Sequence, residues 1–379
     1  MALKLGIVGL PNVGKSTLFN ALTKNQVPAE NYPFCTIDPN IGVVAVHDPR
    51  VDKLSELSNS AKTIYATVEF VDIAGIVAGA SKGEGLGNKF LSNIMEVDAI
   101  VQVVRAFENR DIVHVNESVN PHRDIETINT ELILKDIEIL EKIIERTKKE
   151  LRVSPKYKSY IAFLENILAG LNEGTLAQNI IESYFEQNKE MQNDEIFKVE
   201  YKQLQLLTNK PFLFLANVSE EDINLSENKL RQILGFPSSG GVSEARGGLL
   251  AISVKLESEI AMLNDEDKVE FMKEYDMDES GLDKLIHASY KLLGLESYFT
   301  TGTDETRAWT IKTSTNARDA AGVIHTDFAK KFIMAEVVSY DDFVTLGGFK
   351  ACKEAGKLRM ESKDYIVQDG DICEFRVGN

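Results

Sequence analysis

Residues 9–17 read Gly9-Leu10-Pro11-Asn12-Val13-Gly14-Lys15-Ser16-Thr17, and this stretch decides the fold of the 379-residue chain. It fits the phosphate-loop pattern G-x-x-x-x-G-K-[ST]. The apolar run 3–8 before it predicts a buried strand, and the run 18–23 after it predicts a helix, which is the context that the pattern requires. The glycines allow a tight turn whose N–H groups cradle phosphate oxygens at the positive end of the helix. We therefore expect a nucleotide to contact Asn12, Val13, Gly14, Lys15, Ser16 and Thr17.

Three side chains in this part of the chain fit the chemistry of phosphoryl transfer. Lys15 should reach the β- and γ-phosphates, and the Ser16 hydroxyl should bind Mg²⁺. The stretch 33–39 begins and ends with proline and predicts a loop. Thr36 in this loop would bind Mg²⁺ and the γ-phosphate, as in a switch segment; a plain surface loop is the alternative.

A D-x-x-G pattern follows the next buried strand that the sequence predicts. Its Asp72 comes 57 residues after Lys15 and would share the Mg²⁺, and the N–H of Gly75 would contact the γ-phosphate. The next residue is Ile76, which cannot orient the attacking water as the glutamine of many small GTPases does. Either another residue or a partner positions the water, or intrinsic turnover is slow.

Two loop segments complete the expected phosphate end. The segment 79–87 carries four glycines in nine positions, which is typical of a switch loop that approaches the phosphates, or of disorder. His114 lies in the loop after the nearly continuous apolar run 98–105, which predicts a strand covered on both faces. This histidine is a candidate for positioning water or relaying a proton, and a solvent-exposed bystander is the alternative.

The residues expected at the nucleobase are Asn217-Val218-Ser219-Glu220, which follow another buried strand. GTP-binding proteins carry N-K-x-D at this place. The Asp accepts from guanine N1–H and the N2 amine, and the Lys packs on the base. Val218 and Glu220 replace that pair here, whereas adenine presents an N6 donor and an N1 acceptor. The sequence therefore favours adenine, bordered by Asn217, Val218, Glu220 and, after the next strand, Ser253.

Composition limits the partners of the chain. The net charge of −17 and the pI of about 4.9 give solubility and no global attraction to DNA or to an anionic membrane. Any contact with nucleic acid must then rest on a local basic patch. Three cysteines without a pairing pattern indicate a reducing, cytoplasmic setting. No signal peptide is expected, and no apolar run approaches the roughly 18 residues of a membrane span.

From Asp124 the sequence takes on a helical period. Apolar residues recur at helical spacings on both sides of Ser154-Pro155, which predicts two antiparallel helices with a turn there. The basic residues near this turn are Arg146, Lys148, Lys149, Arg152, Lys156 and Lys158. This cluster predicts either a patch that contacts RNA or a solvated helix tip.

The last part of the chain has a different pattern. Short strands, turns and one helix, expected around 327–335, indicate a small β-grasp-like domain. The stretch 367–377 predicts a strand, an Asp-Gly turn and a second strand. This part contains no catalytic constellation, so we expect it to bind a partner.

Together these motifs closely resemble those of the Obg-like ATPases of the YchF family. The resemblance rests on G-L-P-N-V-G-K-S-T, on D-I-A-G followed by I-V-x-G-A-S-x-G-x-G-L-G-N-x-F-L, and on N-V-S-E in place of N-K-x-D. It extends over essentially the whole chain and implies an inserted helical arm and a C-terminal TGS domain. It also implies use of ATP in preference to GTP, K⁺ held by Asn12 in place of an arginine finger, support of hydrolysis by His114, and association with the ribosome in translation and stress responses.

The expected fold class is α/β. A P-loop NTPase domain would cover 1–127 and 208–296, an inserted antiparallel helical arm 128–207, and a β-grasp-like TGS domain 297–379. The expected function is an ATP-binding and ATP-hydrolysing switch, dependent on Mg²⁺ and stimulated by K⁺. It would meet ribosomal RNA and protein through the arm and the TGS-like domain. The alternatives are an Obg-type GTPase, and a nucleotide-gated ribosome-binding protein whose turnover is incidental.

Overall fold

A computed structural model gives the fold for residues 3–24, 40–73, 86–109, 118–152, 154–237 and 247–378. Three of the expected site residues, Thr36, Gly75 and His114, lie outside these ranges. The chain divides into two compact units. Unit 1 comprises Met1–Leu3, Ala21–Glu69 and Leu263–Asn379, and unit 2 comprises Lys4–Asn20 and Phe70–Met262.

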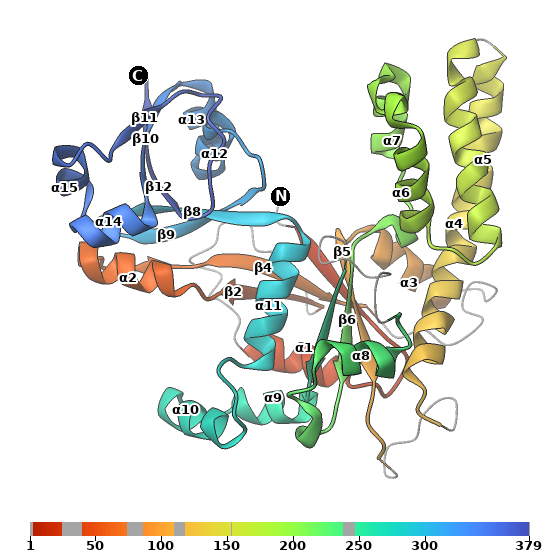
Figure 1. Ribbon diagram of the computed structural model, residues 1–379, viewed down its shortest axis with the longest axis horizontal. Coiled ribbons are helices and arrows are strands. Elements are labelled where there is room, and N and C mark those ends of the chain that lie inside the picture. Colours follow the sequence, from red (N-terminus) through yellow and green to blue (C-terminus); the bar gives the residue numbers. More distant parts are fainter. Residues whose placement is uncertain are drawn as a thin grey trace. The chain divides into compact units, whose positions relative to one another are not determined.

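The centre of unit 2 is a parallel sheet. Its strands stand in the order β1, β5, β6 and β7, and their bounds are Lys4–Val8, Ala99–Arg105, Phe212–Asn217 and Gly247–Ile252. The strands β5 and β6 are buried along their whole length, as the apolar runs predict for strands covered on both faces. Strand β4 (Ala66–Asp72) ends in this unit, next to β1. Because the strands are parallel, their carboxyl ends lie at one edge of the sheet, where the site is found (Figure 1).

Helices connect these strands, as parallel pairing requires. Besides α1 (Lys15–Lys24), the helices and 3₁₀ turns of unit 2 outside the arm are α3 (Leu86–Met95), η5 (Leu207–Asn209), η6 (Glu220–Asp222), α8 (Glu227–Leu234) and α9 (Val254–Ile260). Helix α8 ends at Gly235, which has the left-handed conformation that favours glycine at this position. Within the described parts of the chain, no helix combines the length and the apolar character needed to cross a bilayer.

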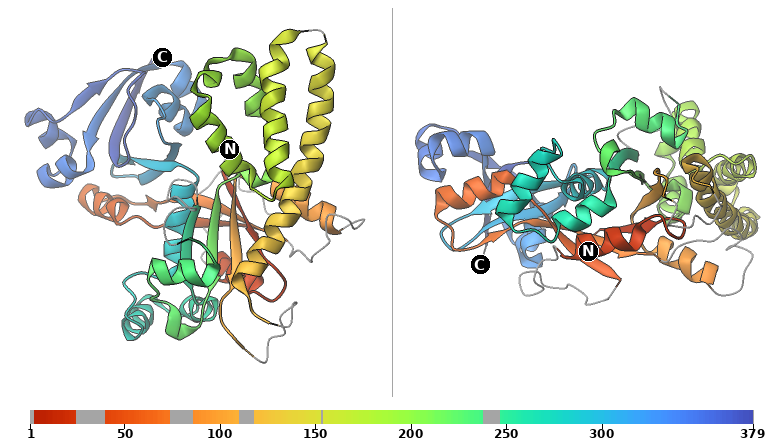
Figure 2. Two further views of the ribbon diagram at one scale, coloured as in Figure 1. Left: turned by 45° about the vertical axis from the view of Figure 1, so that its right-hand side comes forward. Right: turned by 90° about the horizontal axis from the view of Figure 1, so that it is seen from below.

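The arm expected from the helical period is present in unit 2. Helix α4 (Pro121–Leu151) and helix α5 (Lys158–Asn172) pack side by side in both views of Figure 2, joined through the short turn η3 (Pro155–Tyr157). Helix α4 starts three residues before Asp124 because Asn120 caps it, accepting from the N–H of Arg123, and Pro121 follows. Three shorter elements continue the arm: α6 (Ala177–Gln187), η4 (Lys189–Asn193) and α7 (Glu195–Gln203).

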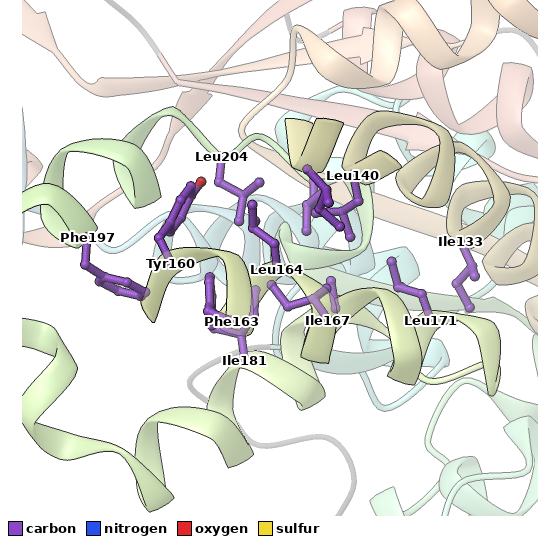
Figure 3. Packing of buried hydrophobic residues seen from close by; sticks show 13 residues of the cluster. Ile133, Leu140, Tyr160, Phe163, Leu164, Ile167, Leu171, Ile181, Phe197 and Leu204 are labelled. Atoms are coloured by element: carbon purple, nitrogen blue, oxygen red, sulfur yellow. The ribbon is translucent and has the colours of Figure 1, made fainter. Parts of the chain in front are cut away.

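A separate hydrophobic cluster holds the arm together (Figure 3). Leu140 on α4 and Phe163 on α5 are fully buried in it. The ring of Phe163 lies 5.0 Å from that of Phe197 on α7, in an edge-to-face arrangement that stabilises aromatic pairs. The arm thus has its own core and does not rely on helix propensity.

One buried carboxylate fixes the arm to the strand that follows it. Asp136 on α4 has no exposed surface and accepts from the N–H of Leu207 at 2.7 Å, the N–H of Thr208 at 2.8 Å and the Thr208 hydroxyl at 2.6 Å. The same hydroxyl oxygen accepts from the N–H of Ala177 at the start of α6, at 3.0 Å. The side chains of Asp136 and Thr208 together therefore join α4, α6 and the turn before β6.

The six basic residues of the arm divide into two groups. Arg146, Lys148 and Lys149 pair with glutamates at 3.6, 2.7 and 3.1 Å. Arg152, Lys156 and Lys158 are exposed, and no acidic partner is found for them among the described residues. All six side chains are exposed, but only three of them have no acidic partner among the described residues.

Unit 1 contains β2 (Ile41–Val46) beside β4, the helices α2 (Pro49–Ser58), α10 (Asp265–Glu274) and α11 (Gly281–Leu292), and a mixed sheet. The order of this sheet is β11, β10, β12, β8, β9 and β3, with bounds Arg359–Glu361, Phe332–Ser339, Asp371–Val377, Leu295–Thr301, Thr306–Lys312 and Thr63–Ile64. Its helices are α12 (Ala317–Ile324), α13 (Thr326–Lys330), α14 (Tyr340–Leu346) and α15 (Phe349–Glu354).

Two predictions for this last part are wrong. The helix expected around 327–335 ends at Lys330, and β10 begins at Phe332, so a strand occupies its second half. The hairpin expected over 367–377 is a single strand, β12, which pairs with β10 and β8. The side chain of Asp371 takes hydrogen bonds from the segment before β12. It accepts from the N–H of Gln368 at 2.9 Å and from the Tyr365 hydroxyl at 2.7 Å. A turn closed by an Asp side chain therefore takes the place of the first strand.

Candidate functional site

The loop between β1 and α1 has the backbone shape of an anion site. Asn12 and Gly14 have positive φ angles of 64° and 100°, and helix α1 (Lys15–Lys24) starts immediately after them. The N–H of Leu18 donates to the carbonyl of Gly14 at 2.9 Å, which closes the first helical turn. This turn contains no acidic side chain. Its outward N–H groups and the helix dipole favour a negatively charged ligand.

Gly14 cannot carry a side chain. A Cβ at this position would lie 2.4 Å from the side-chain nitrogen of Asn217, and the φ angle of 100° is unfavourable for any L residue. The glycine of the sequence pattern is thus required twice, for its backbone conformation and for the approach of Asn217.

Lys15 meets the D-x-x-G aspartate directly. Its ammonium lies 2.9 Å from Oδ1 of Asp72 at the end of β4, and Lys15 as a whole is 9% exposed. Two residues 57 positions apart are therefore in contact, which agrees with the strand assignments from the sequence. The side chains of Ser16 and Thr17, in the same turn of α1, are exposed to solvent. The chain thus presents a cation, a carboxylate and two hydroxyls at one end of the sheet.

Asn217, at the end of β6, connects both sides of the site. Its Nδ2 donates to the carbonyl of Val13 at 2.9 Å, and its Oδ1 accepts from the N–H of Val254 at 3.1 Å. The residue is 5% exposed, so these bonds are shielded from water. Asn217 therefore sets the position of the phosphate loop relative to the start of α9.

A cleft of about 720 Å³ begins at this asparagine and has the size of a small-molecule site. The expected site residues that line it are Asn12, Gly14, Thr17, Asn217, Val218, Glu220 and Ser253. Val218 is 2% exposed, and its N–H donates to the carbonyl of Ile252 at 2.9 Å. Ser253 caps α9, its hydroxyl accepting from the N–H of Leu256. The structure thus brings the expected nucleobase residues and part of the phosphate loop into one cleft, whereas Val13, Lys15 and Ser16 do not line it.

Glu220 has a partner across the mouth of this cleft. Its Oε1 lies 2.7 Å from the ammonium of Lys255, the second residue of α9. The carboxylate at the fourth position of the Asn217–Glu220 motif is therefore held by a cation.

The sequence did not indicate that the segment after β5 also lines the cleft. Phe107 and Asn109 line it, and Arg105 positions both. Arg105 is 1% exposed; its Nε donates to the carbonyl of Phe107 at 3.1 Å and a second guanidinium nitrogen donates to that of Asn109 at 3.0 Å. Its guanidinium carbon lies 4.8 Å from the centre of the Phe107 ring, and burial lowers the pKa of Arg105. The signal in the sequence was this single charge at the end of a buried strand in which Gln102 is the one other polar residue.

Similar proteins agree with this architecture. A family profile described as 50S ribosome-binding GTPase matches residues 4–152, and the YchF-GTPase_C profile, described as a protein of unknown function (DUF933), matches residues 295–378. The proteins of Bacillus subtilis (strain 168) and Escherichia coli O157:H7, both named ribosome-binding ATPase YchF, are 50% and 47% identical. Each alignment covers 99% of this chain and 99% of the relative.

A solved structure extends the similarity to three dimensions. The structure of the Schizosaccharomyces pombe YchF GTPase is 37% identical to the chain and has a TM-score of 0.80. The match covers 99% of this chain and 97% of that one. With identities of this size over nearly the full length, the chain belongs to the YchF family.

Proposed function

We propose that the protein is a cytoplasmic ATPase that binds ATP in the cleft at the carboxyl edge of the unit 2 sheet. The observation that carries the proposal is the cleft wall formed by Val218 and Glu220. A buried valine stands where guanine-binding proteins carry a lysine, and the carboxylate that could accept from guanine is paired with Lys255. The names of the relatives differ on the nucleotide, ATPase for the bacterial proteins and GTPase for the yeast structure, so the proposal rests on the chemistry of the cleft.

The triphosphate would lie on the N–H groups of residues 12–17, with the Lys15 ammonium on the β- and γ-phosphates. Asp72 is the counterion of Lys15 at 2.9 Å, and the Lys15 ammonium would exchange this contact for phosphate oxygens. Water attacks the γ-phosphate, and the positive charge of Lys15 stabilises the charge that develops there. We assign the N–H of Gly75 to the γ-phosphate and His114 to the positioning of water. Ile76 has no group for that task, so a low intrinsic rate is expected.

Two cations belong to the proposal. Among the described residues, no group of three or more His, Cys, Asp or Glu side chains could by itself hold a metal ion. The residues present fit Mg²⁺ bound jointly with phosphate, because the Ser16 hydroxyl is exposed beside Lys15 and Asp72 contacts Lys15. Ser16, Thr36 and Asp72 would hold Mg²⁺, which supplies charge neutralisation on the β- and γ-phosphates. Asn12 would hold K⁺ in the place of an arginine finger.

The partner in this proposal is the ribosome. For the domains, we keep the limits that the sequence predicts. The arm, 128–207, would contact RNA through Arg152, Lys156 and Lys158 at its turn, since the other basic side chains there have glutamate partners. The TGS-like domain, 297–379, would contribute a second contact, and 1–127 with 208–296 would bind the nucleotide. Charge reversal at Arg152 and Lys156 should weaken ribosome association in a co-sedimentation assay, and should weaken it less at high salt.

The test of the proposed function is calorimetric titration with imido analogues of MgATP and MgGTP in KCl. Tighter ATP binding by about tenfold, which is about 1.4 kcal/mol, is expected. Lys15→Ala should abolish tight binding of either nucleotide, because the phosphates lose their cation. Equal or tighter binding of the GTP analogue would overturn the adenine preference in favour of an Obg-type GTPase. ATP turnover that neither K⁺ nor ribosomes raise would favour a nucleotide-gated binding protein.

A further inference from the structure

Lys255 has no role in the phosphate chemistry, yet it lies at the mouth of the nucleotide cleft. Its ammonium is 2.7 Å from Oε1 of Glu220, and the two side chains come from different elements, α9 and η6. Both residues line the cleft together with Val218 and Phe107. The ion pair therefore forms part of the wall that a nucleobase would meet.

The chemistry of this pair bears on the choice of nucleobase. Replacing Asp by Glu at the fourth position of the motif keeps a carboxylate, which could still accept from guanine N1–H and the N2 amine. Replacing Lys by Val at the second position of the motif removes only the packing of the Lys side chain on the base. Neither substitution alone excludes guanine. The choice of base therefore depends on the partner that already occupies the Glu220 carboxylate. In this structure it accepts from Lys255.

We propose that Lys255 is a specificity-determining residue, whose ammonium binds Oε1 of the Glu220 carboxylate and thereby competes with guanine for this acceptor. The ammonium has only donors, so it opposes the donors N1–H and N2–H₂ of guanine and suits the N1 acceptor of adenine. Rejection of guanine and acceptance of adenine then have one cause, which combines a repulsive and an attractive element. The inference rests on the proposed function, because it requires the base to lie in this cleft.

A purely structural role of the pair predicts a different result. The side chains of Lys255 and Glu220 are 72% and 34% exposed. Ion pairs at such exposed positions contribute little to folding, so loss of Lys255 should leave the melting temperature close to that of the parent protein. If the pair had only a structural role, loss of Lys255 would leave the ratio of ATP affinity to GTP affinity unchanged, so a change in this ratio identifies a role in specificity.

The experiment compares three variants with the parent protein by titration with imido analogues of MgATP, MgGTP and MgITP. Lys255→Ala should lower the preference for ATP over GTP by about tenfold or more, the effect of one charge-assisted hydrogen bond made available to guanine. The inosine analogue, which lacks the N2 amine, should gain less than the guanine analogue. Adding Glu220→Gln to Lys255→Ala should cancel the gain. Lys229→Ala, an exposed lysine on α8 outside the cleft, is the charge-matched control and should change nothing.

The outcomes separate this inference from the proposed function. A parent protein that prefers ATP and a Lys255→Ala variant with the same preference would overturn the role of Lys255 and leave the proposed function standing. A parent protein that binds GTP as well as ATP would overturn the proposed adenine preference and, with it, this inference. A gain for GTP that survives Glu220→Gln would assign the effect to a group other than the Glu220 carboxylate and would also overturn the inference.

Discussion

The Asn217 side chain allows the sharpest test of how the site is held together. It bonds to the carbonyl of Val13 at 2.9 Å and to the N–H of Val254 at 3.1 Å, and it is 5% exposed. Asn217→Ala leaves one buried carbonyl and one buried N–H without their partner. Each such group costs about 1–3 kcal/mol. We therefore expect the free energy of unfolding to fall by about 2–4 kcal/mol, since water can reach part of the space that the amide leaves.

The same change should weaken nucleotide binding, because Val13 belongs to the phosphate loop and Val254 starts α9, and Asn217 joins the two segments. With the amide gone, the phosphate loop is no longer fixed relative to α9, and binding must restore that order. A loss of affinity for the MgATP analogue of roughly tenfold, about 1.4 kcal/mol, is expected by calorimetry. Asn217→Asp keeps an acceptor for the Val254 N–H but directs a second acceptor at the Val13 carbonyl. This variant adds negative charge near the phosphates and should bind more weakly than Asn217→Ala.

The control for Asn217 is Asn172→Ala on α5. That amide donates only to the carbonyl of Leu168 in its own helix, at 2.8 Å, and is exposed. Its loss should change the free energy of unfolding by no more than about 0.5 kcal/mol and leave the affinity unchanged. Urea unfolding followed by circular dichroism measures the first quantity, and calorimetry the second. If Asn217→Ala behaves like Asn172→Ala in both assays, the two hydrogen bonds do not organise the site.

Three further changes test other parts of the chain. Asn12→Ala should remove the stimulation of ATP turnover by K⁺ over Na⁺, and an unchanged K⁺ response would place the ion elsewhere. Asp136→Ala deprives two buried N–H groups and a hydroxyl of their acceptor, so urea unfolding should show a loss of about 3–5 kcal/mol in unit 2. Burial raises the pKa of Tyr290 from 10.0 to about 12, so the folded state keeps this proton where the unfolded chain loses it, and stability falls as pH rises from about 10 to about 12. Tyr290→Phe lacks that dependence; between pH 9 and pH 11 its deficit relative to the parent should shrink by about 1.4 kcal/mol in urea titrations, and a constant deficit would contradict the shift.

The phosphate end of the described site could be predicted from the sequence because each motif there is tied to a strand end. Lys15 and Asp72 are far apart in the chain, yet Asp72 ends β4 and Lys15 starts the helix after β1, its neighbour in the sheet. Carboxyl ends of parallel strands meet at one edge, so the motifs placed both residues at the same end of the sheet, whereas their contact at 2.9 Å required the structure. The same logic applies to Asn217 at the end of β6, although its two hydrogen bonds required the structure.

Contacts that side chains make outside the regular pattern of helices and strands could not be predicted, because they follow no period. The pair of Lys255 and Glu220 joins α9 to η6, and the bond from Arg105 to the carbonyl of Phe107 depends on how the chain turns after β5. The arm gives the complementary case. Its helices follow from the apolar spacing, whereas the neutralisation of Lys148 by Glu165 depends on how two helices are rotated against each other. Composition showed the charges and the structure showed which of them have partners.

The ion pair of Lys15 and Asp72 suggests how one site can both bind a nucleotide and report it. The two side chains are only 10% and 23% exposed, so the ammonium and the carboxylate are each partly withdrawn from water and each needs a partner. A triphosphate that takes the ammonium must leave Asp72 with a new counterion, and the proposed Mg²⁺ is the group that fits. Asp72 ends β4, three residues before Gly75, which we assign to the γ-phosphate. Binding of a triphosphate to the phosphate loop therefore changes the partner of Asp72, close in sequence to Gly75. On this argument Asp72→Asn, which can still accept from Lys15 but carries no charge, should retain nucleotide binding more fully than hydrolysis.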